Sequence, residues 1–416
     1  MTARRVGIIS KLWPPRYGGG ERYLHDLARV LAERGLDVRV FCGTEPIAGR
    51  DNGVLPATCY VDPRLRLGSS WSKALKEGKA ERAAVLAEYS FMDAAVRWAR
   101  EQEIHVALLG HPFSLTPMFH TRELSLQLKA GGIRVGLVHL DLSYPIERAL
   151  LRTYRDLGRS WEAAAQVVDR ELARLVKRGD PNEVYYEIGS PLFFRPDFVI
   201  ACSAWSMRFI DPAGSVPQFV FHPPLDRAHW SGVAPQAERL ERRDILLVNP
   251  QSRKGPEIMA SLVAAADPAW TFRILQGGWG DSFAEFVPMV AQTAAVRERR
   301  VEFRERVPDM REAYRAAGVL VFPSRIEGYG MTAVEPMFAG TPVVSSNYPA
   351  ILEAVGDGAL TLCPFTDPPD RWREAVRTVL ADPAPWRARA LAWALQLDDR
   401  RQSQSAALVD FVRSQR

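Results

Sequence analysis

Two glutamates, Glu327 and Glu335, flank seven residues that contain a glycine turn. The apolar run at 318–322 predicts a buried strand, and the segment at 331–338 predicts the first turns of a helix. Glu327 would then lie in the strand-to-helix loop, and Glu335 further along the helix. Backbone N–H groups at a helix start can bind a diphosphate, while carboxylates accept hydrogen bonds from sugar hydroxyls. The spacing therefore predicts a cleft for an anionic, hydroxylated ligand, although an ordinary strand-helix unit with two surface glutamates is the alternative.

A second glycine-rich loop lies near the start of the chain. Gly18, Gly19 and Gly20 follow a strand-like run at 6–10, and apolar residues recur at helical spacing from Glu21 onward. Glycines let a backbone approach a phosphate or sugar that a Cβ atom would obstruct. The G-x-G-x-x-G spacing of dinucleotide-binding loops is absent. The loop is therefore an anion-binding candidate, with a plain flexible turn as the alternative.

The elements that must position these loops indicate an α/β protein. The chain has 416 residues, which is too long for one ordinary α/β core and fits two domains of roughly 200 residues each. Strand-like apolar runs alternate with helical segments in both halves, which predicts two Rossmann-like domains with doubly wound parallel sheets. Such sheets bind ligands at the carboxyl ends of their strands.

Composition along the chain predicts where the domains begin and end. We expect a first domain at 1–225, with a helical insertion near 144–190 that is rich in charge. A linker at 226–243 is rich in proline and charge. A second domain follows at 244–395, and the last segment, 396–416, is expected to be helical.

Composition also argues against several classes of protein. The cysteines are far apart in the chain, so zinc ribbons and redox pairs are not expected and a reducing cytoplasm is the simplest location; they are Cys42, Cys59, Cys202 and Cys363. No apolar run has the length of a membrane-spanning helix, and the run at 6–9 is too short for a signal sequence. The net charge of +5 suits a protein that binds an anionic ligand, or simply an arginine-rich surface. No nucleic-acid-binding motif is present.

The glutamate motif and its flanks resemble a known family. Pro323-Ser324 precedes the motif, and Gly340-Thr341-Pro342-Val343-Val344 follows it. Together they resemble the Glu-x7-Glu region of retaining glycosyltransferases with the GT-B fold, of the fourth sequence family (glycosyl transferases group 1). The resemblance covers both halves of the chain. It implies two Rossmann-like domains facing a central cleft, with the acceptor in the first and a nucleotide sugar in the second. In this fold the last helix usually crosses back to the first domain, which 404–413 could do.

The resemblance implies that a basic loop binds the leaving diphosphate. Lys254 would place a positive charge on the diphosphate, and Arg253 could add a bidentate contact. The family often has an arginine several residues before this lysine, where Asn249 or Gln251 stands in this chain. Arg253 or Arg325 is expected to substitute for this arginine.

Further donor-binding residues come from the same resemblance. Glu335 would accept hydrogen bonds from both ribose hydroxyls, and Glu327 would contact the donor sugar, or the acceptor, near the anomeric centre. The remaining donor-binding residues would supply backbone N–H groups or close approach to phosphate, sugar and base; they are Gly18, Gly19, Gly20, Gly277, Gly278, Tyr329, Gly330 and Met331.

The catalytic residues expected from the resemblance are His111, Lys254 and Glu327. His111 matches a strand-end histidine that these enzymes place near the reacting sugar, although a structural role is the alternative. His139 and Asp141 are candidates for the acceptor site, at the same edge of the predicted sheet.

The helical insertion is the least family-like part of the chain. It is expected to contribute aromatic stacking surfaces to the acceptor site, unless it is a surface helical hairpin or a dimer contact. These aromatic candidates are Trp161, Tyr185 and Tyr186.

These residues lead to a functional expectation with open alternatives. The protein is expected to be a metal-independent, retaining glycosyltransferase that moves a sugar from a nucleoside diphosphate to a hydroxyl of a small soluble or natural-product acceptor. No cofactor beyond that co-substrate is expected. Two carboxylates alone also fit a double-displacement glycosidase, but the glycine loops and cations favour a nucleotide donor. A membrane-surface transferase acting on a lipid or polysaccharide precursor, with 72–79 as a weak amphipathic candidate, a nucleotide-sugar epimerase and a non-catalytic binding protein remain alternatives. The oligomeric state is open.

Overall fold

The chain folds into two compact units. One comprises Met1–Pro224 with Gln402–Arg416, and the other Leu225–Arg401. The computed structural model describes residues 4–13, 19–43, 55, 57–60, 62, 82–110, 118–158, 160–211, 214–225, 227, 230, 244–277, 282–305, 307 and 309–415. Most of the predicted linker at 226–243 and all of the amphipathic candidate at 72–79 lie outside these residues.

The first unit is built on a parallel sheet with strand order β3-β2-β1-β4-β5-β6-β7 in the described part of the chain. The order reverses between β1 and β4, as in doubly wound folds. Strands such as β4 and β6 are buried along their whole length, which explains their continuous apolar sequence. The strands are β1 (Arg5–Ser10), β2 (Asp37–Cys42), β3 (Ala57–Cys59), β4 (Val106–Leu109), β5 (Arg134–His139), β6 (Phe198–Ala201) and β7 (Gln218–Val220).

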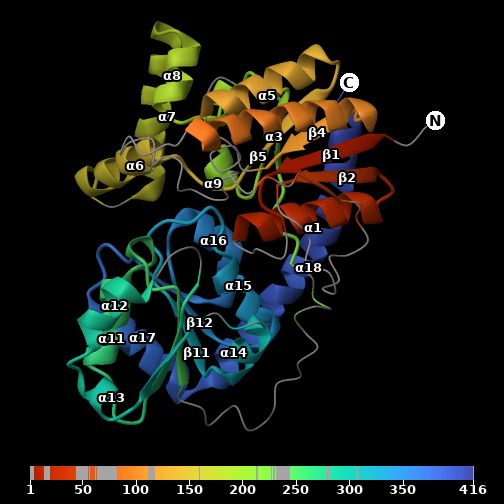
Figure 1. Ribbon diagram of the computed structural model, residues 1–416. Coiled ribbons are helices and arrows are strands. Elements are labelled where there is room, and N and C mark those ends of the chain that lie inside the picture. The colour runs from red at the N-terminus through yellow and green to blue at the C-terminus, as the bar shows by residue number, and fades with distance from the viewer. Residues whose placement is uncertain are drawn as a thin grey trace. The chain divides into compact units, whose positions relative to one another are not determined.

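Helices cover both faces of this sheet. α3 (Arg82–Glu101) and α5 (Met118–Ala130) pack side by side over one face, and α1 (Gly19–Glu33) lies on the opposite face (Figure 1). α1 buries an apolar stripe that includes Leu24, Leu27 and Leu31, the spacing expected for an amphipathic helix. A short helix, α9 (Ala204–Met207), follows β6.

The predicted insertion is helical. It contains α6 (Tyr144–Asp156), α7 (Trp161–Arg178) and α8 (Pro181–Glu187). α6 packs against α7, and α7 begins at a capping serine, because the Ser160 side chain accepts a hydrogen bond from the backbone N–H of Ala163. The helical segments expected from sequence are therefore present.

The second unit repeats the doubly wound design. Its described parallel sheet has the order β10-β9-β8-β11-β12-β13. Its strands are β8 (Asp244–Val248), β9 (Thr271–Leu275), β10 (Val301–Arg304), β11 (Val319–Phe322), β12 (Val343–Ser346) and β13 (Leu360–Leu362).

The helices of the second unit also lie on both faces of its sheet (Figure 1). One face carries α11 (Pro256–Ala264), α12 (Phe283–Val290), α13 (Ala294–Arg297) and α17 (Pro369–Ala381). The other carries α14 (Met310–Ala316), α15 (Met331–Phe338) and α16 (Pro349–Val355).

The last helix, α18 (Pro383–Ser414), contributes residues to both units. Its final part belongs to the first unit. There Phe411 packs between Phe198 and Phe219, with ring centroids 5.5 and 5.1 Å away. Gln404 also forms a 2.9 Å hydrogen bond with the Nδ1 atom of His222. These contacts fasten the carboxyl-terminal segment to the first unit.

Strand pairing brings together two cysteines that the sequence separates. Cys42 and Cys59 are register partners at the carboxyl ends of β2 and β3, and their Sγ atoms lie 3.3 Å apart. No disulfide joins them. Two cysteines that are separated along the chain therefore lie in contact in the structure. Chain spacing could not show the contact, because it depends on the register of two parallel strands.

Candidate active site

The loop between β11 and α15 is the centre of the candidate site. The strand ends at Phe322, and α15 begins at Met331 after Gly330, so the strand and helix predicted around the two glutamates are both present. Gly330 has a φ of 103°, a backbone conformation that favours glycine. It thereby turns the chain so that the first N–H groups of α15 are available for an anion.

Glu327 lies in this loop and is held by two donors. The Lys254 ammonium forms an ion pair with its Oε1 atom, and the Ser324 hydroxyl donates to the same oxygen at 2.6 Å. The side chains of Lys254 and Glu327 are 23% and 14% exposed, while Ser324 is fully buried. Two of the predicted catalytic residues, Lys254 and Glu327, are thus in direct contact. Ser324 was not assigned a role from sequence, because a serine in a loop carries no distinctive signal.

The loop that carries Lys254 packs closely against the loop that follows β11. The backbone N–H of Arg325 donates to the carbonyl of Arg253 at 2.9 Å. Gly255 has a φ of 69°, and a Cβ atom placed there would lie 2.4 Å from the carbonyl oxygen of Pro323. Only glycine fits this close approach. The structure therefore explains why a glycine follows the lysine in the Lys-Gly pair that the sequence analysis singled out.

Replacing Gly255 by alanine should therefore destabilise the protein. The alanine would adopt left-handed backbone and overlap Pro323, and we expect a loss of roughly 2–5 kcal/mol in the free energy of unfolding. Gly158→Ala is the matched control, because Gly158 has a φ of 68° with no atom within 4 Å of an added Cβ. It should lose only roughly 1–2 kcal/mol. Urea unfolding measures both variants, and equal losses would show that the contact with Pro323 does not matter.

Glu335 occupies a more enclosed position than Glu327. It is 8% exposed and lies on α15. The hydroxyl of Tyr314, on α14, donates to its Oε2 atom at 2.7 Å. A carboxylate at this depth needs hydrogen-bond donors, and the buried phenol supplies one. Sequence reasoning did not find Tyr314, because a tyrosine in an amphipathic helix is usually an ordinary core residue.

The structure also describes most of the other donor residues that were predicted in the second unit. Gly277 follows β9, and a Cβ there would lie 3.1 Å from the Cβ of Asn249; Gly278 lies outside the described residues. Arg325 forms an ion pair with Glu257 at 3.1 Å, whereas Arg253 is exposed. Tyr329 is buried, and Met331 is the first residue of α15.

The described glycine and histidine candidates of the first unit lie at the start of a helix or at the end of a strand. Gly19 and Gly20 are the first residues of α1, which begins two positions before the expected Glu21. His139 ends β5 and is 2% exposed, with Asp141 shortly after it. Gly18 and His111 lie outside the described residues.

The aromatic candidates of the insertion make ring contacts within the unit. Trp161 stacks on Tyr154 with ring centroids 4.0 Å apart. Tyr186 is 45% exposed and packs against Phe193 at 5.3 Å. Burial, followed by the nearby Asp211 carboxylate, raises the pKa of the Tyr185 phenol.

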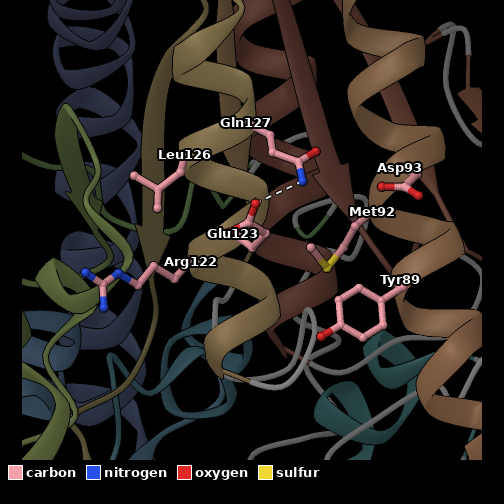
Figure 2. A pocket seen from close by; sticks show the side chains of 7 residues that line it. All are labelled: Tyr89, Met92, Asp93, Arg122, Glu123, Leu126 and Gln127. Carbon is pink, nitrogen blue, oxygen red and sulfur yellow. Dashed lines mark hydrogen bonds between the residues drawn. The ribbon is translucent and has the colours of Figure 1, made fainter.

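A pocket of about 530 Å³ opens between α3 and α5 of the first unit. Figure 2 shows its mixed polar and apolar lining and the 3.0 Å hydrogen bond from Gln127 to Glu123. The lining residues are Tyr89, Met92, Asp93, Arg122, Glu123, Leu126 and Gln127. Two helices on the face of the sheet form this pocket, whereas doubly wound folds bind ligands at the carboxyl ends of the strands. None of the residues singled out from sequence lines it.

Neither a metal cluster nor a membrane span is found in the described part of the chain. No three His, Cys, Asp or Glu side chains there are grouped so that they could hold a metal ion. No described helix combines the length and apolar character needed to cross a bilayer.

Solved structures with the same architecture define the class of fold. Sucrose-phosphate synthase (tll1590) from Thermosynechococcus elongatus is 18% identical with a TM-score of 0.66, over 99% of this chain and 98% of that one. Alr3699/HepE from Anabaena, in complex with UDP and glucose, is 15% identical with a TM-score of 0.67, over 98% and 99%. The chain therefore has the two-domain α/β fold called GT-B.

Sequence comparison then finds a family that part of the chain matches. Residues 251–382 match the family described as Glycosyl transferases group 1. D-inositol 3-phosphate glycosyltransferase of Corynebacterium glutamicum (strain R) is 31% identical over 140 residues, 32% of this chain and 33% of that protein. The corresponding protein of Nocardiopsis dassonvillei is 30% identical over 152 residues, 33% and 34%. The matches thus span about a third of these relatives. The segment 251–382 therefore matches glycosyl transferases group 1, which confirms the resemblance inferred from its motifs.

Proposed function

We propose that the protein transfers a sugar from a nucleoside diphosphate donor to a hydroxyl of an acceptor, with retention of configuration at the anomeric carbon. The observation that carries this proposal is the meeting of Lys254 and Glu327 beside the start of α15. This arrangement lies within the matched family region. It combines a cation and a helix N-terminus for a diphosphate with a carboxylate for a sugar.

The second unit holds the donor in this proposal. Lys254, the N-terminus of α15 and backbone N–H groups at 329–331 bind the diphosphate. Glu335 accepts hydrogen bonds from the ribose hydroxyls, and Gly277 and Gly278 border the nucleotide. Either Arg253 or Arg325 adds a second cation; Arg325 would first have to exchange its contact with Glu257. The relative solved with UDP and glucose supports a nucleotide sugar as the donor class.

The chemical step breaks the bond between the anomeric carbon and the diphosphate oxygen. The acceptor oxygen forms the new bond on the same face, and its proton passes to the leaving phosphate. Lys254 and the α15 N-terminus stabilise the negative charge that develops on the diphosphate. Glu327 contacts the sugar or the acceptor near the anomeric centre, with its carboxylate oriented by Ser324.

The first unit supplies the acceptor site in this proposal. His111 is proposed to act near the reacting sugar, and Gly18, Gly19 and Gly20 are proposed to allow close approach of the backbone. His139, Asp141, Trp161, Tyr185 and Tyr186 are proposed to line the acceptor, which is a small soluble or natural-product hydroxyl compound. No cofactor or metal is assigned, because the protein's own cations neutralise the diphosphate.

Product stereochemistry tests this proposal. The protein is incubated with glucose and galactose donors carrying UDP, GDP, ADP or dTDP, together with a panel of hydroxylated acceptors including inositol phosphate. NMR of the product should show the same anomeric configuration as the donor. An inverted product would contradict the retaining mechanism, and conversion of the donor without any acceptor would indicate an epimerase instead.

A further inference from the structure

Tyr314 is a buried residue of the second unit whose hydroxyl contacts Glu335. Its side chain is 1% exposed, and its hydroxyl donates to Glu335 Oε2 at 2.7 Å. The two residues lie on α14 and α15, which pack against each other. The contact therefore joins two helices of the second unit through the carboxylate that the proposed function assigns to ribose.

The position of Tyr314 is fixed at its ring and at its backbone. The ring packs against Trp230, with centroids 5.8 Å apart, and Trp230 is itself 2% exposed. The backbone carbonyl of Tyr314 accepts a 2.7 Å hydrogen bond from the Thr341 hydroxyl. Thr341 directly follows the turn that ends α15, and its N–H donates to Pro336 at 3.0 Å. The phenol oxygen is thus held in one place relative to the helix that carries Glu335.

A neutral phenol suits this role better than a cation. A carboxylate can accept about four hydrogen bonds, so the bond from Tyr314 restricts the orientation of the carboxylate while using only part of this capacity. Because the phenol carries no charge, it donates to the carboxylate without adding a positive charge beside it, and ionised acceptors form stronger hydrogen bonds with hydroxyls. Preorganising an acceptor in this way removes the need to order its side chain when the ligand binds.

We infer that Tyr314 is a positioning residue that sets ribose recognition: by orienting the Glu335 carboxylate, it makes the site select ribonucleoside diphosphates over their 2′-deoxy counterparts. This inference rests on the proposed function, which places the ribose hydroxyls at Glu335. Tyr314 acts only through that carboxylate, so its removal should change discrimination between the two sugars and not merely overall affinity.

The test compares Tyr314→Phe with the wild-type protein in calorimetric binding of UDP and 2′-deoxy-UDP, and of the ADP and GDP pairs. Wild-type protein should bind the best ribonucleotide at least about tenfold more tightly than its 2′-deoxy form, the worth of one charge-assisted hydrogen bond. In Tyr314→Phe this ratio should fall to about two, through weaker binding of the ribonucleotide with the deoxy form nearly unchanged.

Tyr23→Phe is the matched control. Tyr23 is also 1% exposed, and its hydroxyl donates to the carbonyl of Phe221 at 2.7 Å, but it belongs to the first unit. The Tyr23→Phe substitution removes an equivalent buried hydrogen bond. It should leave the ratio of ribonucleotide to 2′-deoxynucleotide affinity unchanged. If Tyr314→Phe does not fold, Thr341→Val removes the hydrogen bond that holds the Tyr314 backbone, and it should lower the ratio about two- to threefold.

The outcomes separate this inference from the proposed function. A wild-type ratio that persists in the folded Tyr314→Phe variant, or in Thr341→Val, would overturn the positioning role while leaving nucleotide binding intact. A wild-type protein that binds ribo- and deoxynucleotides equally would overturn it as well, because Glu335 would then not read the 2′-hydroxyl. Failure to bind any nucleoside diphosphate would overturn the proposed function itself, and this inference with it.

Discussion

Replacing Lys254 by methionine should lower kcat/KM for sugar transfer by about 10²–10³-fold, the usual effect of removing one charged group that stabilises a leaving anion. Methionine keeps much of the length and apolar surface of lysine, and the Lys254 Nζ atom lies 5.6 Å from the centre of the Phe322 ring. The variant therefore removes the charge with little change in packing. Steady-state kinetics with saturating acceptor measures the effect.

The Lys254 variant also changes the surroundings of Glu327. In the wild-type protein the Glu327 carboxylate contacts Lys254 and Ser324, so the variant leaves the serine hydroxyl to hold it. Lys177→Met is the control, because Lys177 is an exposed residue of α7 in the first unit. Kinetics unchanged from wild type in Lys254→Met would contradict the assignment of this lysine to the diphosphate.

Replacing Glu335 by alanine should weaken nucleoside diphosphate binding by about 100-fold, because two charge-assisted hydrogen bonds to the ribose would be lost. The loss should appear in the dissociation constant of the free nucleotide, since the ribose lies away from the reacting carbon. Isothermal titration measures it directly. Glu335 is buried, so thermal unfolding of the variant must be recorded alongside to confirm that it folds.

Glu312→Ala is the control for this second variant. Glu312 lies on α14, two residues before Tyr314, and is exposed. It removes a carboxylate from the same neighbourhood without touching the proposed site, so binding should equal that of the wild type. A Glu335→Ala variant that is folded and binds nucleotide normally would rule out Glu335 as the ribose acceptor.

The sequence was sufficient to predict the elements whose signals are local. A continuous apolar strand at 318–322, a glycine turn and a helix start placed Glu327 and Glu335 in a loop and a helix, and the structure has them there. The repeated alternation of strands and helices likewise predicted two doubly wound sheets, because a parallel sheet needs helical crossovers. These features depend on neighbours along the chain.

Contacts between distant segments could not be predicted in the same way. The ion pair of Lys254 with Glu327 joins residues 73 positions apart, and the hydrogen bond from Tyr314 to Glu335 joins two helices. The contact of Cys42 with Cys59 depends on strand register. In each case the residue types are ordinary, and only the packing of helices, strands and loops brings the two residues into contact.

The absence of the family's arginine before Lys254 can be related to the backbone conformation at Asn249. Asn249 or Gln251 stands where that arginine is often found, and Asn249 has a φ of 56° directly after β8. Asparagine tolerates this left-handed conformation better than most residues, so the position is used for a tight turn. In the proposed function the positive charge comes from Lys254 and a neighbouring arginine instead, which raises the expected effect of Lys254→Met.

The most direct test of the central claim is a thermal shift measurement with UDP, GDP, ADP and dTDP on the wild-type, Lys254→Met and Glu335→Ala proteins. We predict that at least one ribonucleotide stabilises the wild-type protein, and that each substitution weakens this stabilisation. Stabilisation that is equally strong in both variants would place the nucleotide elsewhere. The absence of stabilisation by any of the four would contradict a nucleoside diphosphate site in the second unit.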